Sequence, residues 1–307
     1  MSAVCRMLVV GAVALWASMP VPSFAAGSPV WEVRGEGSFL IGGTIHMLRP
    51  RDFPLPEVFD RAYDSTATLV LEVDLAGLET PDLQRLIAER GFQSPGRTLA
   101  DDLRPATWQR LTAVAEELGI GIGMLEVMRP SFAGLTLARA MLGRLGVTEV
   151  GTDGYFYRRA RADGRPLAGL ESAEEQMLLL LSLGEEDPDR FLDASLEDLE
   201  RARGLIDEAI EAWRGGDFEL LNERLIEPSR LDDPTSYQRL FVDRNAAWLP
   251  TLESFAASPE RQFVLVGAGH LGGQDGLLHA LRVAGYEVRP WHHQHLQTGE
   301  LHGGRLE

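Results

Sequence analysis

The sequence predicts an α/β protein with one central β-sheet, completed by strands from both ends of the chain and flanked by helices, with a helical insert. Two apolar runs rich in β-prone residues lie near the chain ends: Phe39 to Pro50 (FLIGGTIHMLRP) and Phe263 to Gly273 (FVLVGAGHLGG). Helical apolar spacing dominates the residues between them. Strands at both ends with helices between them favour a single α/β domain that carries a helical subdomain.

In the first half of the chain, Val30 to Gly35 and Ser38 to Ile41 predict a hairpin that leads into the first of these runs. A helix is expected at Glu57 to Tyr63, and the run ATLVLEV, Ala67 to Val73, predicts a second core strand. Three further segments have helical spacing with Pro or Gly at most boundaries: residues 81–90, 105–118 and 130–145.

In the second half, a short strand is expected to end at Leu170. Ser172 and Glu175 have capping-box spacing for a helix through Leu183. Pro188 opens a long acidic amphipathic helix that ends at Gly215-Gly216. The remaining predicted elements are a helix at Ser236 to Phe255 with Pro250 as a potential break, a helix at Gly273 to Ala284, and a last strand at Tyr286 to Arg289. The domain is therefore expected over 26–291, with the helical insert at about 100–165 and 185–255.

Residues 1–25 have the features of a cleavable signal peptide. Arg6 supplies positive charge, Met7 to Ala17 is apolar, and Ser23-Phe24-Ala25 is a small-x-small cleavage signal. The apolar stretch of about eleven residues is too short to span a bilayer. We therefore expect a periplasmic or secreted protein with no stable membrane insertion after cleavage. Residues 292–307 predict a flexible tail that contains histidines.

Composition excludes several classes of function. The formal net charge of −17 argues against nucleic acid or anionic lipid as a partner. Cys5, the single cysteine, leaves with the signal peptide, so a metal site must use His, Asp and Glu. HExxH, Gly-x-Ser-x-Gly, Walker and Rossmann motifs are absent. A peptide or small-molecule substrate is expected, and the oligomeric state stays open.

Both apolar runs end in Gly-x-x-His, which places His46 and His270 just past the C-terminal ends of two strands. In open α/β sheets that edge is where binding sites form. A lone histidine there is more often a satisfied surface or core residue than a ligand. Two such units, from opposite ends of the chain, favour a site, since neutral imidazole is a common metal ligand and general base.

Glu72 lies inside the apolar strand run ATLVLEVDL, with Val70 and Asp74 on the same face. A buried carboxylate is costly unless it is paired, protonated or bound to a cation. Glu72 is therefore either the partner of a structural arginine or a metal ligand or general base, and we favour the second interpretation. Asp74 is a weaker candidate of the same kind.

Arg244 contradicts its local pattern in a similar way. Tyr237, Phe241, Arg244 and Trp248 fall on one helical face, so the arginine lies in an aromatic stripe. Because Arg does not lose its proton, it needs an anion there: Glu72, Glu171 or a substrate oxyanion. The alternative is an aliphatic stem on apolar surface with its head in water. The adjacent Asn245 is less informative.

Two acidic residues have local explanations. Glu171 ends the predicted strand before Ser172, where it either completes a site or favours the helix N-terminus electrostatically. Asp153, in VGTDGYF, is most simply the cap of a helix over residues 154–162.

Taken together, the motifs resemble the TraB/PrgY/GumN family, which includes the Tiki proteases and is similar in fold to erythromycin-esterase-like and ChaN-like proteins. The resemblance covers about residues 30–290. It rests on GGTIHML, LPEVFDRAYDSTATLVLEVD, GTDGYFYRRA, PLAGLES, the Arg-Asn pair and FVLVGAGHLGGQDGLLHALRVAGYEV.

The resemblance implies a divalent metal cofactor, because Tiki members are metal-dependent proteases commonly studied with manganese or cobalt. The positions that match the family motifs are His46, Glu72, Gly151 to Asp153, Arg244-Asn245 and His270. The second motif reads GAGH, where many relatives have a bulkier residue before the histidine.

Two functions follow as hypotheses. In the first, a metal-dependent hydrolase, most simply a peptidase, binds Mn, Co or Zn through His46, His270 and Glu72, with Glu72 as ligand or water-activating base. Arg244 and Asn245 would stabilise the oxyanion, and Glu171 would complete the site. In the second, the same residues form a non-catalytic envelope protein that sequesters a metal, haem or peptide.

Overall fold

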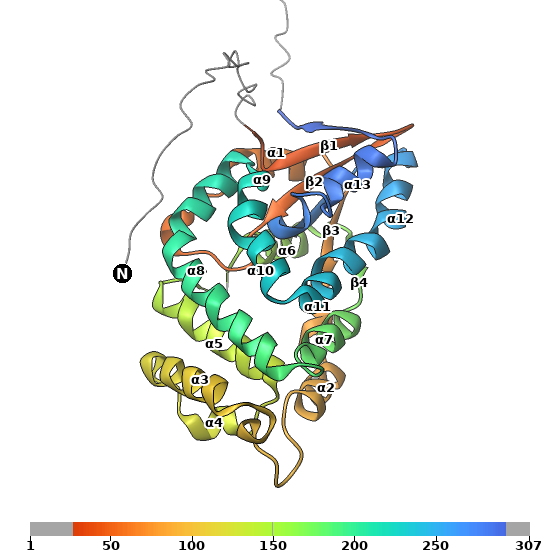
Figure 1. The fold of residues 1–307 in the computed structure, drawn as a ribbon. Helices are drawn as coiled ribbons and strands as arrows, with labels where there is room; N and C mark the ends of the chain where they lie inside the picture. Colours follow the sequence, from red (N-terminus) through yellow and green to blue (C-terminus); the bar gives the residue numbers. More distant parts are fainter. Residues whose placement is uncertain (1–26, 149, 293–307) are drawn as a thin grey trace, which may run out of the picture.

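The computed structural model describes residues 27–148 and 150–292. The predicted signal peptide, Cys5 and the tail residues 293–307 lie outside them. The predicted fold class is confirmed, because a mixed six-stranded sheet lies at the centre and helices surround it (Figure 1). The strands are β1 (Val30–Arg34), β2 (Ser38–Thr44), β3 (Thr68–Val73), β4 (Leu167–Glu171), β5 (Gln262–Gly267) and β6 (Glu287–Pro290).

The two ends of the chain complete this sheet, as the sequence predicts. The strand order is β4-β3-β5-β2-β1-β6, so β5, from the end of the chain, is inserted between β3 and β2. The four strands β4, β3, β5 and β2 are parallel to one another, whereas β1 pairs antiparallel with both β2 and β6. The carboxyl ends of the four parallel strands therefore meet at one edge.

Glycines let β2 run further than predicted. The predicted strand ended at Ile41, but β2 continues through Gly42 and Gly43 to Thr44. A Cβ on Gly43 would lie 2.5 Å from the ring of Phe218, so the missing side chain allows close packing rather than a turn. Thr44 then pairs with Gly267 of β5.

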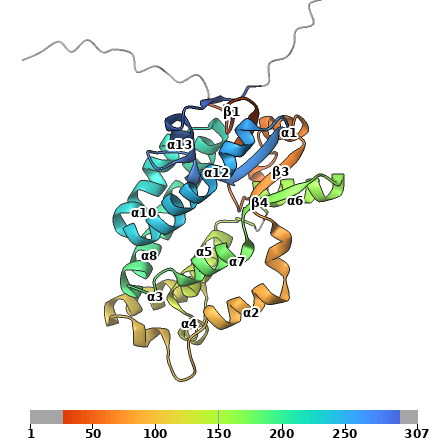
Figure 2. The same cartoon turned by 90° about the vertical axis from the view of Figure 1, so that its right-hand side faces the viewer.

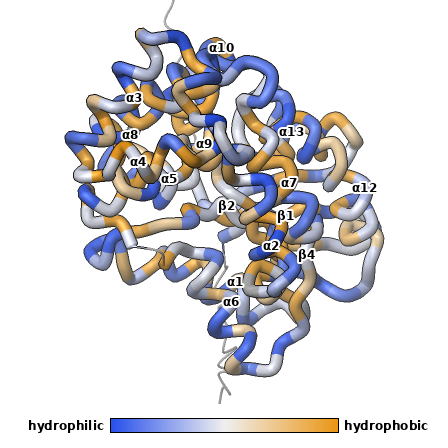
Figure 3. Tube along the Cα trace, turned by 90° about the horizontal axis from the view of Figure 1, so that it is seen from below, coloured by the Kyte–Doolittle hydropathy of each residue, from blue (hydrophilic) through white to orange (hydrophobic). Residues whose placement is uncertain are grey.

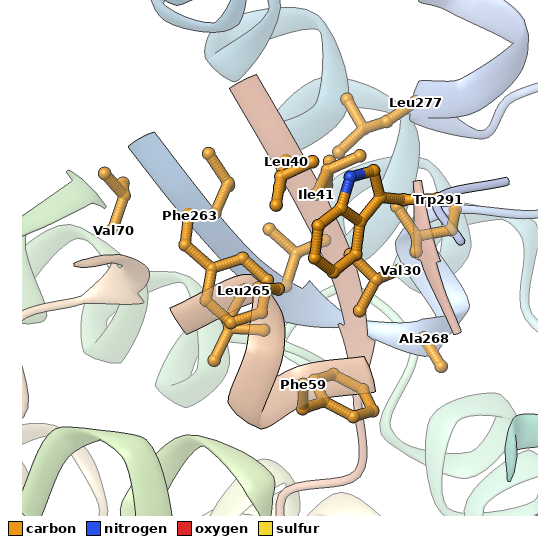
Figure 4. Close-up of a cluster of buried hydrophobic side chains, with 14 of the residues drawn as sticks. Val30, Leu40, Ile41, Phe59, Val70, Phe263, Leu265, Ala268, Leu277 and Trp291 are labelled. Carbon is orange, nitrogen blue, oxygen red and sulfur yellow. The ribbon is translucent and has the colours of Figure 1, made fainter. Parts of the chain in front are cut away.

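Helices from distant parts of the chain cover the sheet. On one face lie α1 (Glu57–Asp64) and α6 (Thr152–Asp163), whose Phe59 and Phe156 contact Phe263 of β5. The other face is covered by α12 (Asp243–Ala257), α13 (Leu277–Val283) and α9 (Phe218–Leu221). Phe59 of α1 and Leu277 of α13 approach the strands from different sides (Figure 4).

A second hydrophobic cluster forms away from the sheet. It joins α3 (Pro105–Leu118), α4 (Ile122–Glu126), α5 (Pro130–Arg144) and the first half of the long helix α8 (Pro188–Gly215). Together with α2 (Pro81–Arg90), these helices lie below the sheet in two perpendicular views (Figures 1 and 2). Helix α7 (Ala173–Ser182) contacts both α2 and α5. Apolar and hydrophilic segments alternate along the helices (Figure 3), as expected for helices that bury one face.

Several helices differ from their predicted bounds. Pro250 does not break α12, which continues through it to Ala257. The predicted helix at 273–284 begins only at Leu277. Before α12 the chain forms α10 (Glu227–Asp232), α11 (Pro234–Tyr237) and two π-helical segments, η4 (Asn222–Ile226) and η5 (Gln238–Val242). Within the described residues, no helix combines the length and hydropathy of a membrane span.

Replacing Gly43 with Ala should destabilise the fold, because the new Cβ must displace the ring of Phe218. We expect a loss of about 1–3 kcal/mol in the free energy of unfolding, measured by urea denaturation. Gly143→Ala is the matched control, since nothing lies within 4 Å of a Cβ at that helical position. Equal effects of the two substitutions would contradict close packing at Gly43.

Candidate functional site

The edge formed by the carboxyl ends of the parallel strands brings the predicted site residues together. All six lie in one connected cluster: His46, Glu72, Glu171, Arg244, Asn245 and His270. Glu72 and Glu171 come from the ends of the paired strands β3 and β4. Arg244 and Asn245 come from the first turn of α12.

The two histidines converge on Glu72. His46 lies just past β2, and His270 ends the short 3₁₀ turn Ala268–His270 that follows β5. The Nε2 atom of each imidazole lies 3.9 Å from Oε1 of Glu72. Glu72 is held in place by the Gly267 N–H group, which donates to Oε1 at 2.7 Å. The predicted convergence of both histidines with a buried carboxylate is therefore confirmed.

The other ring nitrogen of each histidine is anchored. Nδ1 of His46 lies 2.9 Å from Oδ2 of Asp153, and Nδ1 of His270 lies 2.7 Å from Oδ1 of Asn245. The Asn245 amide donates to the Asp275 carbonyl at 2.8 Å, which fixes its orientation. Nδ1 of His270 therefore donates to Asn245, and its Nε2 carries the lone pair. An imidazole anchored in this way at Nδ1 presents Nε2 to the site.

Asp153 is not the helix cap that its sequence context predicts. The N-cap of α6 is Gly151, with no side-chain hydrogen bond, and Asp153 lies within the first turn. Its two carboxylate oxygens bond instead to Thr44 Oγ1 at 2.8 Å and to His46. A Cβ on Gly151 would lie 2.2 Å from the backbone of His46, so glycine allows this close approach.

Asp74 does not belong to the site. It follows β3 and is exposed, and its side chain accepts from the Ala76 N–H group at the start of a 3₁₀ turn. The strand alternation that grouped it with Glu72 ends at Val73.

Arg244 lies between the two carboxylates, so of the two alternatives that the aromatic stripe left open, the anion partner is the one found. Its Nη2 donates to Glu72 Oε2 at 2.5 Å and to Glu171 Oε1 at 2.7 Å, and Nε bonds to Glu171 as well. Its Nη1 donates to Nε2 of His270 at 3.0 Å. The guanidinium also lies over the Trp248 ring, 4.6 Å from its centroid.

Gln176 completes this network, and no sequence pattern had singled it out. It lies on α7, one turn after Ser172, and its amide donates to both Glu72 and Glu171. The capping box of Ser172 and Glu175 is confirmed and sets the position of that turn. A glutamine one helical turn beyond a strand-end glutamate carries no signal by itself.

The surrounding residues set the protonation states of His46, His270 and Glu72. The charge of Asp153 raises the pKa of His46 to about 9. Burial lowers the pKa of His270 to about 4, and the Arg244 cation acts in the same direction. Burial works to raise the pKa of Glu72, but the neighbouring positive charges and the Gly267 N–H outweigh it and lower this pKa to about 2. Without a cation, His46 is therefore protonated near neutral pH, His270 is neutral and Glu72 is ionised. To bind a cation, His46 has to release the proton on Nε2, because only a neutral imidazole is a ligand.

The donor set fits a divalent cation. Two imidazoles and one carboxylate, with a free position for water, are ligands of catalytic zinc sites. A Cβ on Gly267 would lie 3.1 Å from His46 Nε2 and 3.2 Å from Glu72 Oε1, so glycine keeps the space between the donors clear. As they stand, no three His, Asp or Glu side chains in the described part of the chain are close enough to hold a metal. Arg244 bonds to His270 Nε2, so this nitrogen becomes a ligand only when the guanidinium moves away.

A cavity of about 510 Å³ opens beside these residues, and His46, Glu72, Arg244 and His270 all line it. The His46 side chain is 59% exposed because it borders this cavity, whereas His270 is buried beneath the rings of Phe241 and Trp248. The site is therefore accessible from the cavity side.

The fold and the site define a class of α/β proteins in which two histidines and a strand glutamate meet at the carboxyl edge of a sheet completed by both chain ends. The chain belongs to the TraB/PrgY/gumN family, whose family model matches residues 29–290.

Two relatives cover most of the chain. The chain is 25% identical over 272 residues to the uncharacterized protein YbaP of Escherichia coli strain K12. This alignment covers 87% of the chain and 97% of that protein. The uncharacterized protein YbaP of Shigella flexneri is 26% identical to the chain over 244 residues, an alignment that covers 78% of the chain and 86% of that protein. No solved structure matches this chain significantly.

Replacing Asp153 with Asn should lower the pKa of His46 from about 9 by about one unit or more, because the anion that stabilises the imidazolium is removed. The measurement is an NMR titration of the His46 ring protons. Asp74→Asn is the control, because this exposed carboxylate does not contact the imidazole. A His46 pKa that is unchanged in Asp153→Asn would show that another group sets it.

Proposed function

We propose that this protein is a metal-dependent hydrolase of the cell envelope that cleaves peptides. The observation that carries the proposal is the convergence of two Nδ1-anchored imidazoles on Oε1 of a buried, ionised glutamate. The apparent signal peptide in residues 1–25 supports a periplasmic or secreted location. The choice of peptides rests on the resemblance to the Tiki proteases.

His46, His270 and Glu72 would hold the cation, which is Mn, Co or Zn. Such a cation lowers the pKa of a bound water and polarises the scissile carbonyl. Glu72 is suited to holding the cation rather than to accepting a proton, because its pKa of about 2 makes it a weak base. Asp153 keeps the His46 ring in place through Nδ1.

Arg244 would stabilise the negative charge that develops on the carbonyl oxygen. Its guanidinium lines the cavity, and the Nη1 N–H that now bonds to His270 becomes a free donor when the guanidinium moves away from that histidine. Glu171 and Gln176 then act as positioning residues, since Glu171 binds the guanidinium and Gln176 binds Glu171. Asn245 is also a positioning residue rather than an oxyanion donor, because it is buried behind His270 and bonded to it.

The direct test is metal analysis of the purified protein together with cleavage of a peptide library. We expect about one divalent cation per chain, and cleavage that a chelator abolishes. His46→Ala should lose the cation and reduce cleavage at least about a hundredfold. His279→Ala, which changes an exposed histidine on α13, should leave both unchanged.

A wild-type protein that binds no divalent cation would contradict the proposal. Bound metal without cleavage of any peptide would favour the non-catalytic alternative, a protein that sequesters its ligand.

Arg244→Gln should separate metal binding from catalysis. Removing the guanidinium frees Nε2 of His270 and removes a positive charge beside the ligands. The variant should therefore bind the metal at least about tenfold more tightly than the wild type does. Cleavage should fall by about 10²-fold or more, because the oxyanion loses its donor. Isothermal titration with Mn²⁺ and peptide kinetics measure the two effects.

The matched control for this variant is Arg289→Gln. Arg289 also pairs with a buried carboxylate, Glu32, but lies on β6, away from the cavity lining. Weaker metal binding by Arg244→Gln than by the control would show that the guanidinium supports the cation rather than competing with it.

A further inference from the structure

The two outermost strands of the sheet differ in how their free edges are protected. The strand order leaves β4 at one end and β6 at the other, each hydrogen-bonded to a strand on one side only. An edge strand presents unpaired N–H and C=O groups that can pair with another chain, so proteins commonly block such edges with proline, charge or a covering element. The edge of β6 is blocked in this way, whereas the edge of β4 is open.

Proline and charge block the edge of β6. The Trp291 N–H group donates to the Val30 carbonyl at 2.9 Å, so alternation along the strand turns the backbone groups of Val288 and Pro290 outward. Pro290 has no N–H group to donate. Arg289, which lies between them, is exposed and charged. Within this described strand, Val288 is therefore the single outward donor.

The outward backbone groups of β4 are unpaired. The Leu69 N–H group donates to the Pro166 carbonyl at 3.0 Å, and in the parallel register this bond turns the backbone groups of Leu167, Gly169 and Glu171 away from β3. Among the described residues, no hydrogen bond reaches the outward groups of Leu167 and Gly169. Gly169, in the middle of the strand, is exposed.

The charged residues at the two ends of β4 are turned away from its edge. Arg165, just before the strand, donates to the Thr66 carbonyl at 3.0 Å. The carboxylate of Glu171, the last residue of the strand, is bound by Arg244. Residues 167–170 between them have neither charge nor proline. The edge of β4 therefore lacks the usual features that prevent pairing with another chain.

The outward groups of β4 are self-complementary. In an antiparallel pair made by two copies of β4, Gly169 lies opposite Gly169 of the second copy, and Leu167 lies opposite Glu171 at each end. These are hydrogen-bonded pairs, in which both residues donate and accept, so every outward donor and acceptor finds a partner. The glycines at the centre bring no side chains that could hold the strands apart.

The blocked edge of β6 limits such an assembly to two copies. Pairing of β4 with β6 would repeat from copy to copy and build an open filament. Pairing of β4 with β4 is isologous and uses both open edges, so it closes as a dimer. Because the two strands run antiparallel, the carboxyl edges of the two sheets point in opposite directions. The two candidate sites then lie at opposite ends of the shared sheet.

We propose that two copies of this protein associate through β4, so that their sheets join into one. The association is weak, because a single pair of short strands buries less surface than a stable interface needs. Each copy also has a formal net charge of −17 and repels the other. The dimer therefore forms at high protein concentration, and salt favours it by screening the repulsion. This inference does not depend on the proposed hydrolase function.

Sedimentation velocity of the purified protein in about 0.3 M NaCl tests the association. We expect monomers at about 1 μM and dimers at about 500 μM. Leu167→Pro removes an outward donor without removing a hydrogen bond to β3, and should shift the association at least about tenfold to higher concentration. Val288→Pro is the matched control, since it makes the same change at a partly buried position on β6 and should leave the association unchanged.

Amide hydrogen exchange, followed by mass spectrometry, is a second measurement that needs no variant if Leu167→Pro unfolds by circular dichroism. The N–H groups of Leu167 and Gly169 should exchange at least about tenfold more slowly at 500 μM than at 1 μM, because pairing protects them. The Val288 N–H group should exchange at the same rate at both concentrations.

A protein that is still monomeric at about 500 μM overturns the inference. A dimer that Leu167→Pro leaves intact, or that Val288→Pro weakens equally, overturns it as well, since the contact then lies elsewhere. Concentration-dependent protection of Leu167 and Gly169, with none at Val288, supports it.

Discussion

The ion pairs of Arg244 are the interaction on which the site depends. Glu72 and Glu171 are both largely buried at the ends of adjacent strands, and such carboxylates repel each other unless a cation lies between them. Removing one partner from a buried pair costs about 3–5 kcal/mol. Arg244 meets this need and at the same time bonds to His270, so the group that holds the two carboxylates together also competes with a metal for its ligands.

The sheet explains why the site forms only in the complete fold. β5, from the end of the chain, lies between β2 and β3, so the residues just past these strands become neighbours. Thr44 pairs with Gly267, which places His46 and His270 on either side of Glu72. Neither histidine reaches the glutamate unless both chain ends join the sheet. The long connections between them are free to build the helical cavity wall.

Much of the site was predictable because its residues conflict with their local patterns. A charged residue in a buried strand or in an aromatic stripe needs a partner, and this located Glu72 and Arg244. The role of Asp153 was not predictable in this way, since a helix cap explains it locally and its partner His46 is 107 positions away. The extension of β2 through Gly43 and the cavity wall likewise depend on contacts with distant residues such as Phe218. Local spacing cannot reveal such contacts.

Anomalous scattering from a crystal of the metal-loaded protein tests the central claim most directly. The account predicts one strong peak about 2.0–2.2 Å from Nε2 of both His46 and His270, with a Glu72 oxygen as a further ligand. The Arg244 guanidinium should no longer bond to His270. A metal bound only elsewhere, with Arg244 still bonded to His270 Nε2, would contradict it.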